Sequence, residues 1–92
     1  MMTLSLENWS YFTDLEKSFY EKLSYENLLS SMSNRNLPTN EYFEEYQNVI
    51  KTYSELCQKL EQEIIIPATN QEKVFWEVDF VDKCVKIRKE SN

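Results

Sequence analysis

Glycine and histidine are both missing from this chain of 92 residues. Glycine supplies positive backbone φ angles and lets a backbone approach a phosphate closely, so phosphate-binding loops and dinucleotide-binding fingerprints are excluded. Histidine is the commonest general base and a frequent transition-metal ligand, and no serine–histidine–aspartate triad can be built without it. These absences remove the most frequent catalytic sites, and we expect a protein that is not an enzyme.

Cysteine is also scarce. Cys57 and Cys84 are the two cysteines of the chain, too few for a disulfide framework or a four-ligand zinc site. Cys57 lies in an apolar helical pattern and is expected in the core, whereas Cys84, flanked by Lys83 and Lys86, is expected to be more exposed. We predict no metal, no cofactor and a reducing, cytoplasmic location.

Long apolar runs are absent as well. No stretch approaches the roughly 18 consecutive apolar residues of a transmembrane helix, and residues 1–12 lack the basic start of an export signal. The sequence therefore predicts no membrane association. Its 41% of hydrophobic residues, with five Phe, six Tyr and two Trp, is typical of a folded chain. At this length we expect a single domain, residues 1–92, with one modest core.

Acidic residues outnumber basic ones by 16 to 10, which gives a net charge of −6. The excess lies in residues 1–66, which hold eleven acids and five bases, whereas residues 67–92 hold five of each. Nucleic-acid binding depends on cationic side chains that neutralise phosphates, so no direct nucleic-acid partner is expected. An acidic surface could instead attract a basic protein.

Two helices are predicted over residues 13–66, after an N-terminal arm of residues 1–12. A capping box of Thr13 and Glu16 begins the first helix. The second carries the most regular apolar pattern in the chain, with steps of three and four: Tyr42, Tyr46, Val49, Tyr53, Leu56 and Leu60. Because the turn around Pro38 is short, the helices should pack antiparallel.

A second apolar face is predicted on the first helix. It consists of Tyr25, Leu28, Leu29 and Met32. The arm or a partner should cover this face, so the chain could also be a structural subunit that oligomerises through it.

The C-terminal part is predicted to be a polar connection, residues 67–73, followed by a β-hairpin, residues 74–89. Pro67 should end the second helix. In the hairpin, apolar and charged residues alternate with a period of two. The predicted fold is therefore mainly α within the α+β class: an antiparallel helical hairpin followed by a short C-terminal β-hairpin.

A tight turn centred on Asp82 and Lys83 would set the register of this hairpin. It places Phe80 opposite Val85 and Val78 opposite Ile87. One face is then apolar, with Trp76, Val78, Phe80, Val85 and Ile87 directed inward.

Glu77, Asp79 and Asp82 gather on the outer side of the predicted hairpin. Three carboxylates suggest a small cation site, but the sequence supplies no neutral oxygen ligands or fixed loop to complete one. We interpret them as a charged outer face that discourages aggregation.

Five short runs, SFYEKL (18–23), ENLL (26–29), NEYFEEY (40–46), WEVDF (76–80) and VKI (85–87), carry a family resemblance. In this order they resemble the small accessory proteins of peptide-maturation clusters, of the CXXX repeat peptide modification system type. Those proteins accompany radical S-adenosylmethionine maturases. The resemblance covers residues 14–88 and implies a non-catalytic helper that binds a precursor peptide, its modifying enzyme, or both.

A physical mechanism for such a helper is strand addition, in which an extended peptide pairs with the outer strand of the hairpin. The predicted partner-binding residues are Trp76, Glu77, Val78, Asp79, Phe80 and Lys86.

The alternative function is a small acidic inhibitor or decoy that blocks a basic protein surface. A phage antagonist such as an anti-CRISPR protein, or a toxin's immunity protein, has this profile. Its predicted surface is Glu41, Glu44 and Glu45, at the start of the second helix.

Overall fold

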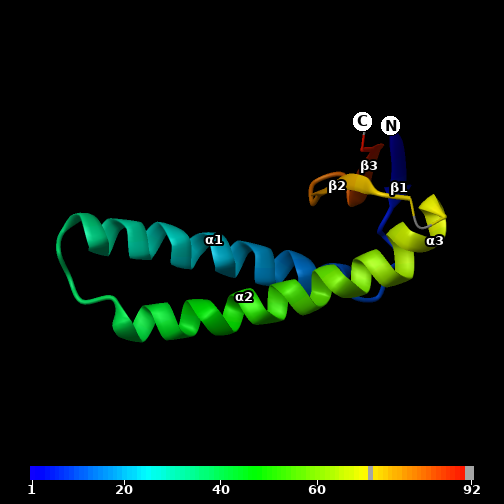
Figure 1. Ribbon diagram of the computed structural model, residues 1–92. Coiled ribbons are helices and arrows are strands. Elements are labelled where there is room, and N and C mark those ends of the chain that lie inside the picture. The colour runs from blue at the N-terminus through cyan, green and yellow to red at the C-terminus, as the bar shows by residue number, and fades with distance from the viewer. Residues whose placement is uncertain (71, 91–92) are drawn as a thin grey trace. The chain divides into compact units, whose positions relative to one another are not determined.

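The computed structural model describes residues 1–70 and 72–90. Its elements are β1 (Met2–Ser5), α1 (Phe12–Asn34), α2 (Asn40–Leu60), the π-helical turn η1 (Glu61–Ile65), α3 (Ile66–Thr69), β2 (Val74–Asp79) and β3 (Cys84–Lys89) (Figure 1). The predicted α+β fold, a helical hairpin followed by a C-terminal β-hairpin, is confirmed. Contacts divide the chain into two compact units, which we call the hairpin unit (Asp14–Cys57) and the sheet unit (Met1–Thr13 with Gln58–Asn92).

The hairpin unit contains most of α1 and α2, which run antiparallel. The Phe19 and Tyr53 rings lie 6.0 Å apart, and Tyr25 Oη donates a hydrogen bond to Glu45 Oε2 at 2.7 Å. Full burial in this unit is confined to one end of the hairpin, where it involves Leu15, Ser18 and Leu56. Over residues 19–55 every side chain is half-buried or exposed.

The predicted second face of α1 follows this pattern. Tyr25, Leu29 and Met32 are half-buried, and Leu28 is 39% exposed. The two helices of the hairpin thus leave this apolar face partly accessible.

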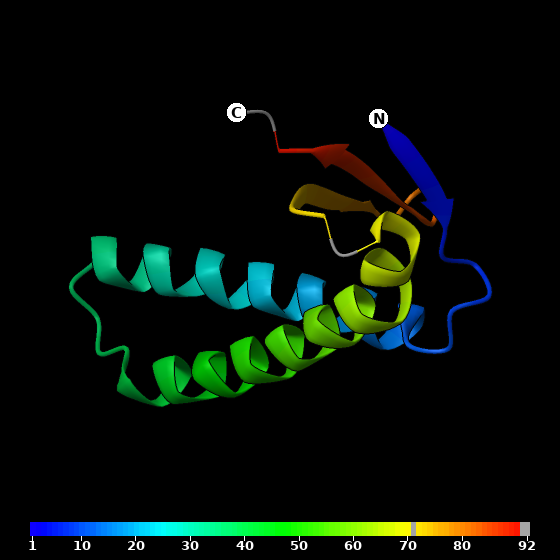
Figure 2. The same ribbon diagram turned by 45° about the vertical axis from the view of Figure 1, so that its right-hand side comes forward.

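The sheet unit contains an antiparallel three-stranded sheet with the order β1-β3-β2 (Figure 2). The third strand, β1, is formed by residues of the N-terminal arm that carried no predicted structure. The buried hydrophobic residues of this unit come from the arm, the end of α2, η1 and the central strand: Leu6, Phe12, Leu60, Ile65, Cys84, Val85 and Ile87. A sheet face packed on helical segments therefore encloses the main core of the chain.

The predicted hairpin spans the right residues, but its register is wrong by two. Val78 lies opposite Val85 and Trp76 opposite Ile87. The strands are joined by four residues, from Phe80 to Lys83, because Asp79 Oδ1 accepts hydrogen bonds from the N–H groups of Val81 and Asp82 at 3.0 and 2.9 Å. A slip of two residues leaves the strand side chains on their predicted faces, whereas Phe80, predicted to lie opposite Val85, falls in the turn.

Positive φ angles occur at three described residues, and with no glycine available they fall on Asn36, Asn70 and Lys83. Asparagine tolerates this region because its short side chain hydrogen-bonds locally. Lysine has no such compensation. Lys83, with a φ of 54°, therefore carries local backbone strain.

The prediction that Pro67 ends the second helix is also wrong. The helical path continues through η1 and α3 to Thr69 and ends at Asn70, whose φ is 52°. In the π turn the Ile66 N–H donates to the Glu61 carbonyl, and this wider turn places Pro67 in the first turn of α3, where a missing N–H costs nothing. Gln71, in the predicted connection, lies outside the described residues.

Candidate functional site

The outer edge of β2 is the candidate site. Hydrogen bonds in an antiparallel ladder alternate, so successive residues of an edge strand point their backbone groups inward and outward. Lys73 O accepts a hydrogen bond from Glu90 N at 3.2 Å, and this bond fixes which residues of β2 pair with β3. The backbone N–H and C=O groups of Phe75, Glu77 and Asp79 point toward β3. The N–H and C=O groups of Val74, Trp76 and Val78 therefore point away from the sheet.

The outer edge of β1 provides an internal comparison. Leu6 N donates a hydrogen bond to Lys83 O at 2.8 Å. By the same alternation, the backbone N–H and C=O groups of Met2 and Leu4 point toward β3. Thr3 and Ser5 point their backbone groups outward. Among the described residues neither edge has a strand partner, but β1 has four residues and β2 has six.

A groove of about 160 Å³ borders β2 on the apolar side of the sheet. Its lining includes Ile65 and Ile66 from the helical segments and Val74 and Trp76 from the strand. Ile66 is 40% exposed. Trp76 Nε1 donates a hydrogen bond to Glu61 Oε1 at 3.2 Å, which holds the indole against the helix. Glu61, Thr69 and Glu72 complete the lining, so an apolar side chain that enters from the edge meets apolar groups with polar ones beside them.

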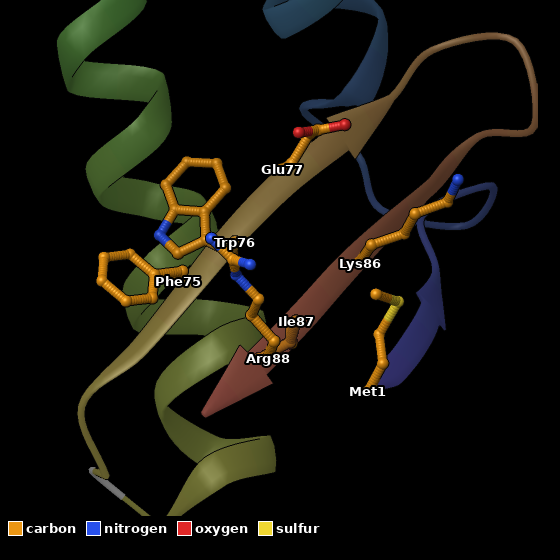
Figure 3. Close-up of a pocket in the computed structure, with 7 residues that line it drawn as sticks. All are labelled: Met1, Phe75, Trp76, Glu77, Lys86, Ile87 and Arg88. Atoms are coloured by element: carbon orange, nitrogen blue, oxygen red, sulfur yellow. The ribbon is translucent and has the colours of Figure 1, made fainter. Parts of the chain in front are cut away.

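The opposite side of the same strand carries Phe75, which is 51% exposed. The Arg88 guanidinium lies over this ring, 5.2 Å from its centroid, in a cation–π contact. Both residues line an open depression of about 420 Å³, together with Glu77 and Lys86 (Figure 3). Exposed aromatic and charged groups thus flank the strand on this face.

The six predicted partner-binding residues separate into three groups. Trp76 and Val78 are half-buried on the apolar side of β2, and Glu77 is exposed on the other. Phe80 lies in the turn, with its ring 5.9 Å from that of Phe12. Asp79 and Lys86 form an ion pair, with Lys86 Nζ 3.5 Å from Asp79 Oδ2. Of the six, Trp76 and Val78 direct their backbone groups outward, and Glu77 lies between them.

The Asp79 carboxylate is held by contacts within the chain: two backbone N–H groups and the Lys86 ammonium. The backbone N–H of Asp82, helped by the Lys86 ammonium, lowers the pKa of the Asp79 carboxyl below its ordinary value. This side chain closes the turn between β2 and β3 and does not lie free for a partner.

Cys84 is buried, so its predicted exposure is wrong. It lies in the central strand, opposite Asp79 on one side and Ser5 on the other.

The alternative acidic surface lies in the first turns of α2. Glu41, Glu44 and Glu45 are exposed, as are Tyr42 at 39% and Phe43 at 47%. Glu45 accepts the hydrogen bond from Tyr25, and that bond raises the pKa of the Tyr25 hydroxyl. Two of the three carboxylates therefore remain available at this surface beside aromatic rings.

Two residues outside the predicted set contribute to the candidate site. They are Ile66 and Val74, which line the groove together. The sequence predicts Ile66 at the end of a helix and Val74 at the first position of the hairpin, and no pattern in it brings the two together. The π turn determines where Ile66 points, and it had no recognised signal.

Residues 1–70 and 72–90 contain no group of three Cys, Asp or Glu side chains arranged to hold a metal ion. Over the same residues, no helix has the length and apolar content needed to cross a bilayer.

Comparisons of this chain with protein-family models, with curated proteins and with solved structures gave no match.

Proposed function

We propose that this protein is a non-catalytic adaptor that binds an extended segment of another protein along the outer edge of β2. In the setting suggested by the family resemblance, that segment belongs to a precursor peptide or to its modifying enzyme, in the cytoplasm. The adaptor would present one to the other without chemistry of its own.

One observation carries this proposal. Val74, Trp76 and Val78 direct three N–H and three C=O groups away from a six-residue strand that no other described strand covers. A strand that adds there gains main-chain hydrogen bonds, each worth about 1 kcal/mol net, and places alternate side chains in the groove beside Ile66.

Proline substitution tests the edge directly. Val78→Pro removes an outward N–H and spares the ladder with β3, because proline is tolerated on an edge strand whose N–H faces solvent. Thr3→Pro is the matched control, since it removes an outward N–H from the edge of β1. Peptides of about 12 residues, selected from a displayed random library on the unmodified protein, serve as probes.

Val78→Pro should weaken these peptides about tenfold or more, and Thr3→Pro should leave their affinity within about twofold. Circular dichroism must first show that both variants fold. Peptides that bind folded Val78→Pro as tightly as the unmodified protein would exclude strand addition at β2.

The acidic decoy remains a second candidate because Glu41 and Glu44 are exposed beside Tyr42 and Phe43. Binding of a basic partner there should fall steeply with salt, whereas strand addition should be less sensitive. Charge reversal of Glu41, Glu44 and Glu45 to Lys should abolish the decoy interaction and leave peptide binding at β2 unchanged.

A further inference from the structure

The chain already contains one strand that pairs with β2, and the residues of that strand alternate in character. In β3, Lys86 lies opposite Glu77, Ile87 opposite Trp76 and Arg88 opposite Phe75. Basic and apolar residues alternate along it. The apolar member is 2% exposed, while the two cations lie on the open face.

A strand added on the outer edge would meet the same three side chains. Strands lie about 4.8 Å apart on either side of β2, and its side chains stand perpendicular to the sheet between their neighbours. On the outer edge Phe75 and Glu77 fall at the positions that are not hydrogen-bonded to the added strand, where opposing side chains approach most closely.

Glu77 sets the charge preference of this edge. Its carboxylate is exposed, and in the described part of the chain no lysine or arginine forms an ion pair with it, since Lys86 pairs with Asp79. Phe75, two residues away, already holds one guanidinium over its ring. A cationic side chain opposite either residue meets a carboxylate or an aromatic face.

The other side of the edge borders the groove, whose lining is partly apolar and partly polar. A residue opposite Trp76 lies on the side of the groove, where Trp76, Ile65 and Ile66 supply apolar surface for an aliphatic side chain. Glu61 stands at the same groove, its carboxylate bound to the indole N–H, and adds negative charge there.

From this arrangement we infer that β2 binds an extended protein segment in which basic and apolar residues alternate, with lysine or arginine opposite Phe75 and Glu77 and an aliphatic residue opposite Trp76. The inference rests on the proposed docking edge and adds the chemistry of its occupant.

A second copy of this chain fits the edge less well. Antiparallel pairing of β2 with its own copy, centred on Glu77, places two carboxylates opposite each other. Centred on Trp76, it places Glu77 opposite Phe75 and provides no cation.

Two defined peptides test the inference: one with the repeat Val-Lys-Ile-Arg, and its counterpart with glutamate in place of both cations. Fluorescence anisotropy should show that the unmodified protein binds the basic peptide about tenfold more tightly. Glu77→Lys should remove or reverse this preference. Asp82→Lys, the same charge change at an exposed position of the turn, should preserve it.

The outcomes separate the two proposals. Equal binding of both peptides, or of neither, overturns the inferred chemistry, as does an unchanged preference in Glu77→Lys. The docking edge itself is judged by the selected library peptides: if these lose affinity in Val78→Pro, strand addition stands although the occupant is of another class. A basic peptide whose binding Val78→Pro does not alter would show that charge alone attracts it.

Discussion

The sheet unit and the hairpin unit use their apolar residues in different ways. Most of the buried hydrophobic side chains belong to the sheet unit, including Leu6, Leu60 and Val85, each 0% exposed. The hairpin unit has the more regular apolar pattern, yet over residues 19–55 it buries no side chain fully. A regular helical pattern therefore does not by itself make a core.

Geometry explains the difference. Two packed helices cover one stripe of each other, and the flanks of both stripes stay accessible. In the sheet unit a sheet face, a π turn and two helix ends surround the same side chains. Local stability should follow this distribution, with the sheet unit opening last.

Truncation of one leucine in each unit should give the largest difference in stability between the two units. Leu60→Ala empties a fully buried site and should lower the free energy of unfolding by about 3 kcal/mol. Leu28→Ala makes the same change at a side chain that is 39% exposed and should cost less than about 1 kcal/mol. Urea denaturation measures both. Equal costs would mean that Leu28 is covered, as in an oligomer formed through α1.

Replacement of Lys83 by glycine should stabilise the sheet unit. The φ of 54° costs a lysine about 1 kcal/mol relative to glycine, so Lys83→Gly should raise the free energy of unfolding by about that amount. Lys83→Ala, which removes the charge but keeps the Cβ, should give no such gain. A destabilised Lys83→Gly variant would contradict the turn geometry.

Acid should weaken the sheet unit through Asp79. Its pKa is lowered in the folded state, so its contribution is present above about pH 4 and is lost as the pH falls through the folded pKa. Asp79→Asn should therefore be less stable than the unmodified protein near pH 6, and the difference should shrink toward pH 2. A difference that is constant with pH would exclude the charged form as its source.

Alkali should act on the hairpin unit through Tyr53, and this is the smallest effect we expect. Burial raises the pKa of Tyr53 to about 12, so the stabilisation is complete below pH 10 and is lost as the pH rises toward 12. Tyr53→Phe should lose less stability over that range. Thermal melts between pH 9 and 11.5 measure it, and parallel curves for both proteins would refute the assignment.

Period and composition predicted much of the fold. The alternation over residues 74–89 and the steps of three and four in α2 led to the right elements. The strand β1 was missed although Met2 and Leu4 alternate with Thr3 and Ser5, because four residues are too few to outweigh the irregular remainder of the arm.

The errors arose where side chains replace the usual turn residues. Asp79 and Lys83 form a four-residue turn without the glycine that usually marks such turns. The π turn lets the helical path continue beyond Pro67. The sequence predicted residues 76–78 of the candidate site because its alternating pattern predicted the strand that contains them. The contribution of Ile66 depends on tertiary packing, which no local pattern encodes.

Hydrogen exchange at the backbone amides of β2 tests the central claim most directly. In the free protein the amides of Val74, Trp76 and Val78 should exchange quickly, and those of Phe75 and Glu77, bonded to β3, slowly. A bound library peptide should protect the three fast amides. Slow exchange at these three in the free protein, or peptide protection at Thr3 and Ser5 instead, would contradict the docking edge.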